Sequence, residues 1–411
     1  MPPLQPVHRG LTSQKLKFTA FALEAANSLS TTYFFYYIYF FTRSNFQFTA
    51  IQNLWLAAVL GFIYGIGSFF GGRSAHTLGY YSAVRIGIVT MLVTFLTCAF
   101  VSATWWAVVG LAMIGSVGMG FTWPGIEALV SEGETPARLP ALVGLYNFVW
   151  SITGAISFFS GGAIMEKFGG RSIFFLPSAL LLLELFLINY LEKVVDRQPA
   201  VMTEITPPLL HAEPEGCHAT VPPKKFLNMA WLANPMAYLA LNTVIATVPN
   251  LAARMNFSRA TAGFICSIWL FSRSVTFVAL RLWPGWHYRF SYLASAYLTL
   301  IISFAAILLA PNPWILAFAQ IFFGMALGLI YYSSLFYSMD IGENKGEGGG
   351  IHEAAIGFGQ GSGPSIAALA LGFFPSIPGS GTCAVSIILA LGFTGICWIR
   401  FAASGANRTL T

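Results

Sequence analysis

Twelve apolar segments, each long enough to cross a bilayer as a helix, follow one another along this chain. About twenty apolar residues span the hydrocarbon core as an α-helix, which satisfies its own backbone hydrogen bonds without water. Only 9% of the residues are charged, against about 25% in soluble domains. The sequence therefore predicts an all-α polytopic membrane protein, and it excludes a soluble enzyme, a disordered chain and a nucleic-acid binder. The predicted spans are 16–41, 48–71, 82–102, 105–130, 140–163, 172–191, 226–249, 260–282, 291–310, 313–338, 350–374 and 382–402.

One polar stretch between the spans is much longer than the others. Residues 192–225 contain six prolines, and this composition is typical of a flexible linker. The stretch divides the chain into an N-terminal six-helix bundle (1–191), a cytoplasmic central linker (192–225) and a C-terminal six-helix bundle (226–411).

Basic residues alternate strongly between the two sides of the predicted membrane. With the N-terminus inside, fifteen Lys and Arg residues fall on the inner segments and five on the outer ones. Because inner loops carry the excess of Lys and Arg, both termini are expected in the cytoplasm and the number of spans is expected to be even. Short loops without a targeting segment fit a bacterial inner membrane.

The two halves repeat a weak pattern at corresponding places. Span 4 contains Gly120-Phe-Thr-Trp-Pro and span 10 contains Gly328-Leu-Ile-Tyr-Tyr, and an acidic residue follows each at the same distance, Glu132 and Asp340. Two parallel six-helix repeats predict a pseudo-two-fold axis along the membrane normal.

The outer end of span 5 carries the most specific local pattern. There the sequence Gly-Gly162-Ala-Ile-Met-Glu166-Lys-Phe-Gly169-Gly-Arg171-Ser-Ile-Phe is similar to the G-G-x-x-x-D/E-x-x-G-W-R-x-x-F turn of the major facilitator superfamily. Gly170 stands where the family has Trp. The pattern predicts a glycine turn across which Glu166 and Arg171 pair.

The segment between spans 2 and 3 matches this family only in part. Gly72 and Gly79 match the glycines of the family's G-x-x-x-D-R-x-G-R-K signature, but His76 stands at the acidic position. In the family, that acid and its basic partners latch the cytoplasmic side. The absence of these residues indicates a divergent member. His76 itself is either pH-responsive or a solvated loop residue.

Resemblance to the major facilitator superfamily implies two pseudo-symmetric six-helix bundles that rock around a cavity lined by spans 1, 4, 7 and 10. It implies a secondary transporter that moves a small organic solute by alternating access, driven by a proton gradient or by the gradient of the solute. The alternatives are a lipid flippase or lipophilic-compound exporter on the same fold, and a non-transporting membrane sensor. No P-loop, nucleophile–base pair or metal-ligand spacing occurs, so we expect no enzyme activity and no cofactor. The expected partners are a solute, the lipid bilayer and a coupling proton, and we expect a monomer.

Ionisable side chains inside the spans are costly and are therefore candidates for function. By the resemblance, Glu24 of span 1, with Asn27 nearby, faces the path; alternatively it is bonded to a neighbouring helix. Arg273 of span 8 needs an acceptor, either an anionic group of the solute or a carboxylate of another span; alternatively it extends toward the membrane interface. His352 and Glu353 open span 11 as a proton site or gating contact, or as a solvated helix start.

Aromatic and amide side chains near the middle of the spans are a second set of candidates. They would line a cavity with aromatic faces and hydrogen bonds, as suits an amphipathic or sugar-like solute. The other aromatic residues of the run 33–41 indicate an interfacial belt. The second set is Tyr33, Tyr36, Trp123, Asn147, Trp150, Asn242, Tyr331 and Tyr332, of which Asn147 and Trp150 share one helix face.

Span 11 contains two overlapping pairs of glycines four residues apart. The pairs are Gly357 with Gly361 and Gly359 with Gly363, and Pro364 follows. Small residues at this spacing predict close helix packing, and the proline predicts a kink. The pattern suits either plain packing or a helix that moves during gating.

Overall fold

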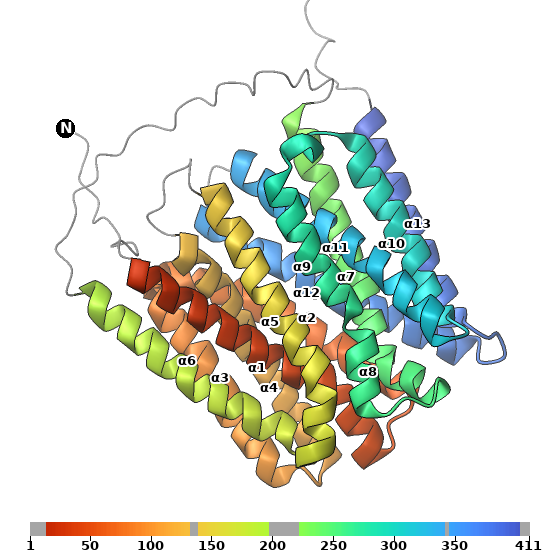
Figure 1. Ribbon diagram of the computed structural model, residues 1–411, viewed down its shortest axis with the longest axis horizontal. Helices are drawn as coiled ribbons and strands as arrows, with labels where there is room; N and C mark the ends of the chain where they lie inside the picture. Colours follow the sequence, from red (N-terminus) through yellow and green to blue (C-terminus); the bar gives the residue numbers. More distant parts are fainter. Residues whose placement is uncertain (1–13, 132–138, 197–221, 342–344, 403–411) are drawn as a thin grey trace, which may run out of the picture.

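The computed structural model of the protein describes residues 14–131, 139–196, 222–341 and 345–402. Within these ranges the chain forms thirteen α-helices and one short 3₁₀ helix, and no strand. Figure 1 shows the helices of the first half lying beside those of the second. The predicted all-α fold is confirmed.

Six helices build the N-terminal half. Each corresponds to one predicted span, although α2 continues seven residues past the predicted end of its span. The helices are α1 (Gln14–Phe46), α2 (Ala50–Leu78), α3 (Tyr80–Val101), α4 (Trp105–Ser131), α5 (Leu139–Phe168) and α6 (Ser172–Asp196).

Seven helices and the 3₁₀ helix build the C-terminal half. They are α7 (Pro223–Arg254), α8 (Arg259–Cys266), α9 (Ile268–Leu282), η1 (Pro284–Trp286), α10 (Phe290–Leu309), α11 (Pro313–Ile341), α12 (Lys345–Phe373) and α13 (Ser380–Phe401). Most of the predicted linker lies outside the described residues.

Span 8 is interrupted, which the sequence did not predict. The continuous helix expected over 260–282 is broken at Ser267, between α8 and α9. A break inside a bilayer leaves backbone carbonyls that need donors. Gln320 of α11 supplies one, because its Nε2 donates to the Ile265 carbonyl at 2.9 Å. The interruption is thus stabilised by a neighbouring helix.

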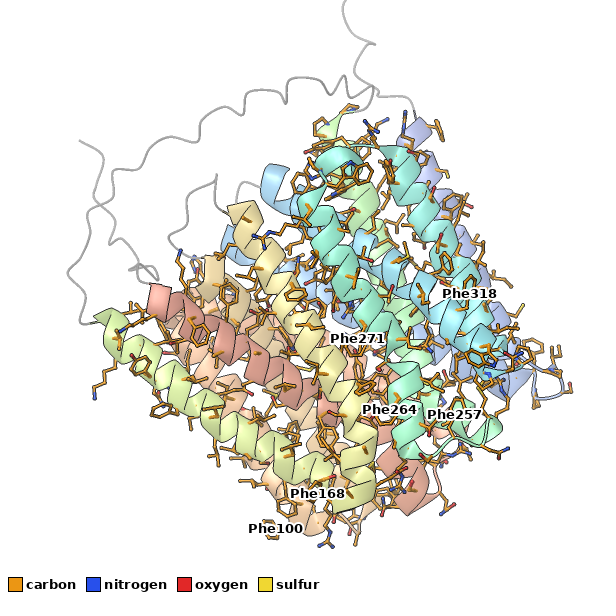
Figure 2. The ribbon with its side chains drawn as sticks, viewed as in Figure 1. Phe100, Phe168, Phe257, Phe264, Phe271 and Phe318 are labelled. Atoms are coloured by element: carbon orange, nitrogen blue, oxygen red, sulfur yellow. The ribbon has the colours of Figure 1, made fainter. Side chains whose placement is uncertain are left out.

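Ten helical segments in the described part of the chain are long and apolar enough to cross a membrane, with α8 and α9 counted together. The two other long helices, α1 and α12, carry polar residues such as Glu24 and Glu353. Large apolar side chains such as Phe100 and Phe168, which are 78% and 69% exposed, lie on the outside of the bundle (Figure 2). An exposed apolar surface of this kind fits a lipid environment.

The two halves meet most closely where α2 packs antiparallel against α12. A Cβ added to Gly65 would lie 3.3 Å from the Gly357 Cα, and one added to Gly72 would lie 2.7 Å from the Gly350 Cα. The second pair of span 11 glycines packs on α7, where a Cβ at Gly359 would lie 2.1 Å from the Pro235 carbonyl oxygen. The predicted close packing of span 11 is therefore confirmed on two neighbouring helices.

Candidate functional site

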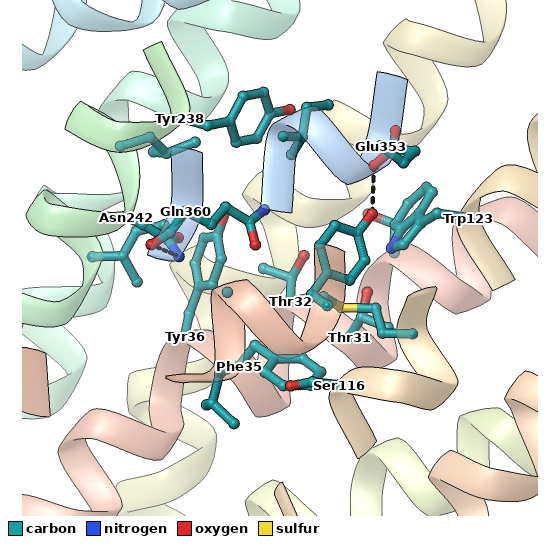
Figure 3. A pocket seen from close by; sticks show the side chains of 18 of the residues that line it. Thr31, Thr32, Phe35, Tyr36, Ser116, Trp123, Tyr238, Asn242, Glu353 and Gln360 are labelled. Carbon is teal, nitrogen blue, oxygen red and sulfur yellow. Dashed lines mark hydrogen bonds between the residues drawn. The ribbon is translucent and has the colours of Figure 1, made fainter. Parts of the chain in front are cut away.

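A cavity of about 130 Å³ lies between the two halves. Four helices of each half line it: α1, α2, α4 and α5 from the first, and α7, α9, α11 and α12 from the second. Figure 3 shows side chains from several of these helices converging on the same space. The resemblance implied spans 1, 4, 7 and 10 as the lining, and the structure adds spans 2, 5, 8 and 11.

Seven of the thirteen predicted path residues line this cavity. The others lie next to it or elsewhere in the bundle. The seven are Tyr36, Trp123, Trp150, Asn242, Arg273, Tyr331 and Glu353.

Arg273 is the only Lys or Arg among the described residues that line the cavity. It lies on α9 and is 2% exposed. Its guanidinium carbon lies 4.4 Å from the ring centroid of Trp150 and 5.1 Å from that of Trp269. These rings stabilise a desolvated cation. The Nε atom is buried and has no hydrogen-bond partner.

Glu353 is the only carboxylate among those lining residues. It lies on α12, two turns inside the helix, so the prediction that it opens this helix is wrong. The Tyr64 hydroxyl of α2 donates to its Oε2, as the dashed line in Figure 3 shows. This hydrogen bond joins the two halves in the wall of the cavity, where α2 packs against α12.

Glu24 lies on α1, fully buried and outside the lining of the cavity. Both of its carboxyl oxygens are buried, and neither has a partner within hydrogen-bonding distance and angle. Both amide atoms of Asn27 and the Nδ2 atom of Asn147 are also buried without a partner. Glu127 of α4 lies within electrostatic range of both Glu24 and Glu353. Buried polar groups therefore continue from the cavity into the N-terminal half.

Asn147 and Trp150 share a helix face as predicted, since the Trp150 Nε1 donates to the Asn147 Oδ1 at 3.2 Å. Only Trp150 reaches the cavity. Nearby, the Ser28 hydroxyl donates to the Trp150 carbonyl at 2.6 Å. These bonds fix the Trp150 ring beside Arg273.

Three predicted path residues are buried elsewhere. The Tyr33 hydroxyl is 2.8 Å from the Ser172 Oγ. The Tyr332 ring packs against Trp286, with centroids 5.6 Å apart. His352 is 7% exposed, with its Nδ1 3.5 Å from the Ser334 Oγ, so it is not a solvated residue.

Most of the aromatic run 33–41 is buried inside the bundle, so the predicted interfacial belt is wrong there. α1 packs against α4, α5, α6 and α7, which leaves little of this run for the membrane surface. Trp105 and Trp106, at the start of α4, are 54% and 66% exposed, as is typical of aromatic residues at a membrane boundary.

Several cavity residues were missed by sequence reasoning. They are uncharged side chains that differ little in the sequence from ordinary residues of a membrane helix. Residue Tyr39 was included in the belt, and the three-residue spacing of Tyr36 and Tyr39 could have placed both on one face. The polar or aromatic residues missed are Ser28, Thr31, Thr32, Phe35, Tyr39, Tyr64, Ser116, Tyr146, Tyr238 and Gln360.

The turn motif at the end of α5 contacts the second half, and the expected pair between Glu166 and Arg171 does not form in the described structure. Glu166 Oε1 accepts the backbone N–H of Ala260 in α8 at 3.0 Å, and no ion pair joins Glu166 to Arg171 in the described structure. A Cβ at Gly162 would lie 2.0 Å from the Arg259 carbonyl oxygen, and Gly169 has a φ of +82°. The expected pair across the turn is thus replaced by a contact with the second half.

Gly72 and His76 lie in α2 rather than in a loop. Gly72 packs against Gly350, and His76 is exposed, as expected for a solvated histidine. Gly79, with a φ of +85°, makes the turn between α2 and α3.

Comparisons with known proteins agree with this architecture. The family model described as Major Facilitator Superfamily matches residues 20–364. The structure of the nucleoside transporter NupG is similar at a TM-score of 0.67 and 15% identity, covering 93% of this chain and 99% of that one. The human organic anion transporter MFSD10 (TETRAN) has a TM-score of 0.64 and 13% identity, with coverage of 93% and 99%.

A third similar structure is a bacterial homolog of the human lysosomal transporter Spinster, inward-facing and unoccupied. Its TM-score is 0.63 at 11% identity, with coverage of 94% of this chain and 93% of that one. No curated protein sequence matches this chain. At these identities the three structures support the fold alone.

Proposed function

Because the chain belongs to the major facilitator superfamily, we propose that it is a secondary active transporter that moves a small organic solute by alternating access. The observation that carries the proposal is the cavity of about 130 Å³, which both six-helix halves line. A site between two pseudo-symmetric halves is the arrangement in which rocking exposes a solute to each side in turn. The protein would act in the bilayer as a monomer, with both termini in the cytoplasm.

Contacts between the halves lie on both sides of this cavity. Towards the predicted outer side, Arg43 of α1 donates to the Asn250 Oδ1 of α7, and Glu166 accepts from Ala260. Towards the inner side, Gly72 of α2 packs on Gly350 of α12. Separate contacts at the two ends allow one end to open while the other stays closed.

We further propose that transport is coupled to a proton through buried carboxyl groups. Glu353 lies in the cavity, and Glu24 is fully buried without a hydrogen bond of normal geometry. Glu127 lies within electrostatic range of both. Ionisable residues are retained inside membrane segments mainly where they serve a pathway or a relay.

The test is solute exchange and uptake in proteoliposomes that contain the full chain. We expect Glu353→Gln and Glu24→Gln to retain solute exchange but to lose accumulation driven by a pH gradient. Glu184→Gln is the matched control, since Glu184 is fully buried but accepts a hydrogen bond from Ser30 outside the cavity. An unchanged pH profile in both Glu353→Gln and Glu24→Gln would refute proton coupling.

Exchange also separates transport from the alternative functions. A wild-type protein that exchanges no water-soluble solute but moves labelled lipid between leaflets would be a flippase. A folded protein with neither activity would be a non-transporting sensor, and the proposal of solute transport would be wrong.

A further inference from the structure

The charge balance of the cavity narrows the class of solute. Arg273 and Glu353 are the only charged side chains among the described residues that line it. No ion pair joins these two side chains in the described structure, and Glu353 accepts a hydrogen bond from Tyr64 instead. The guanidinium of Arg273 is always charged, so the cavity holds a permanent cation without a carboxylate partner.

This unpaired cation is costly where it lies. A buried charge without an opposite charge loses its hydration and is poorly compensated by its surroundings. The neutral Tyr238 hydroxyl lies within hydrogen-bond range of the guanidinium, and the rings of Trp150 and Trp269 compensate in part for the lost hydration. The rings cannot accept the in-plane N–H of Nε, which remains buried without an acceptor. The missing component at Arg273 is therefore an anionic acceptor.

The rest of the cavity indicates what such an anion is attached to. Its walls near Arg273 are the aromatic rings of Tyr36, Trp150 and Tyr331, and Trp150 lies 5.5 Å from Tyr331 between centroids. The Asn242 Nδ2 donates to the backbone carbonyl of Gln360 at 3.2 Å. The side-chain amide oxygens of Asn242 and Gln360 can therefore accept from a solute hydroxyl or amine. Aromatic walls with a few polar groups bind a flat, largely apolar body.

We propose that the solute is a small organic carboxylate with an aromatic or apolar body, whose carboxylate pairs with the Arg273 guanidinium. This inference rests on the proposed transport function and identifies the substrate class of the same cavity. The planar fork of an arginine matches a carboxylate in two parallel hydrogen bonds. Glu353 lies elsewhere in the cavity, hydrogen-bonded to Tyr64, and does not compete for Arg273.

The first test compares ligands of one shape and different charge on the unaltered protein. Phenylacetate, phenylacetamide and phenethylamine, with longer and shorter homologues of each, would be titrated into the full-length protein in detergent by calorimetry and thermal shift. We expect the acids to bind at least tenfold more tightly than their amides and amines. Equal binding of acid and amide, or binding of the amine alone, would overturn the proposal.

The second test uses variants of Arg273. Arg273→Gln should weaken binding of the acid by roughly a hundredfold, the effect of truncating one partner of a buried charge pair, and should weaken binding of the neutral amide much less. Arg273→Lys keeps the charge but loses the fork and should show a smaller loss. Arg281→Gln is the control, because Arg281 lies on the same helix two turns further on, exposed and outside the cavity.

Stability without solute gives an independent result. If Arg273 is held for a ligand, Arg273→Met should melt at or above the wild-type temperature, because it removes an uncompensated charge. A lower melting temperature than that of the wild type, with acid binding retained, would make Arg273 a structural residue. Saturable exchange of a neutral solute alone would refute the carboxylate class while leaving transport intact, whereas absence of all exchange would refute transport itself.

Discussion

The substitution Gly357→Ala tests whether the contact between α2 and α12 controls the conformation of the transporter. A Cβ at this position would lie 2.3 Å from the Gly65 Cα and 2.4 Å from the Gly65 nitrogen. These are backbone atoms and cannot move as a side chain end can. The methyl group therefore forces the two helices, and with them the two halves, apart.

The size of the effect follows from the cost of overpacking. Inserting a methyl group into a packed interface costs about 1–3 kcal/mol. The penalty applies only to the conformation in which α2 and α12 touch. A difference of about 1–3 kcal/mol between two conformations shifts their ratio by roughly 5–150-fold. We expect the population with α2 and α12 separated to rise by this factor.

The assay is a distance measurement between the halves. Spin labels would be attached at Thr77 and Lys224, which are exposed at the inner ends of α2 and α7, in a variant without native cysteines. Pulsed electron paramagnetic resonance would then measure the distance between the two labels. Gly357→Ala should shift the distance distribution between the labels to longer values. It should also lower the melting temperature of the conformation in which α2 and α12 touch.

Gly372→Ala provides a matched control on the same helix. No atom lies within 4 Å of a Cβ at Gly372, so the alanine should raise helix stability slightly and leave the distances unchanged. Equal distance distributions for Gly357→Ala and Gly372→Ala would refute the steric argument.

Three further substitutions test contacts around the site. Gly162→Ala should separate α5 from α8 at the outer end of the bundle, because its Cβ would lie 2.0 Å from the Arg259 carbonyl oxygen. A cysteine introduced at this contact should then react faster with a thiol reagent, and an unchanged rate would contradict the prediction. Glu166→Ala removes the acceptor of the Ala260 N–H at the start of α8 and should lower thermal stability by about 0.3–1 kcal/mol, with Glu166→Gln retaining most of it. Gln320→Leu removes the side-chain donor of the Ile265 carbonyl at the break between α8 and α9 and leaves it only the Ser267 backbone N–H. The substitution should destabilise by about 1–2 kcal/mol, measured by thermal unfolding; full stability would mean that the Ser267 N–H suffices.

Hydrophobicity and charge alone were enough to predict the class of the molecule. Twelve apolar segments and the central linker predicted two six-helix halves, because an apolar segment of about twenty residues crosses a bilayer as a helix whatever its neighbours are. The glycines of span 11 predicted close packing correctly, since a missing side chain permits close approach on any face. The ionisable residues Arg273 and Glu353 were also found, because a charge inside an apolar span is visible in the sequence.

The tertiary structure decided which of these residues share one space. Tyr64 and Glu353 are 289 residues apart and form a hydrogen bond in the wall of the cavity, and Arg273 lies beside Trp150 of the other half. Glu24, by contrast, is buried away from the cavity lining. The physical reason is that in a membrane helix both the lipid-facing and the protein-facing sides are apolar. Hydrophobic periodicity therefore does not show which face turns inward, and only the packing of the two halves determines it.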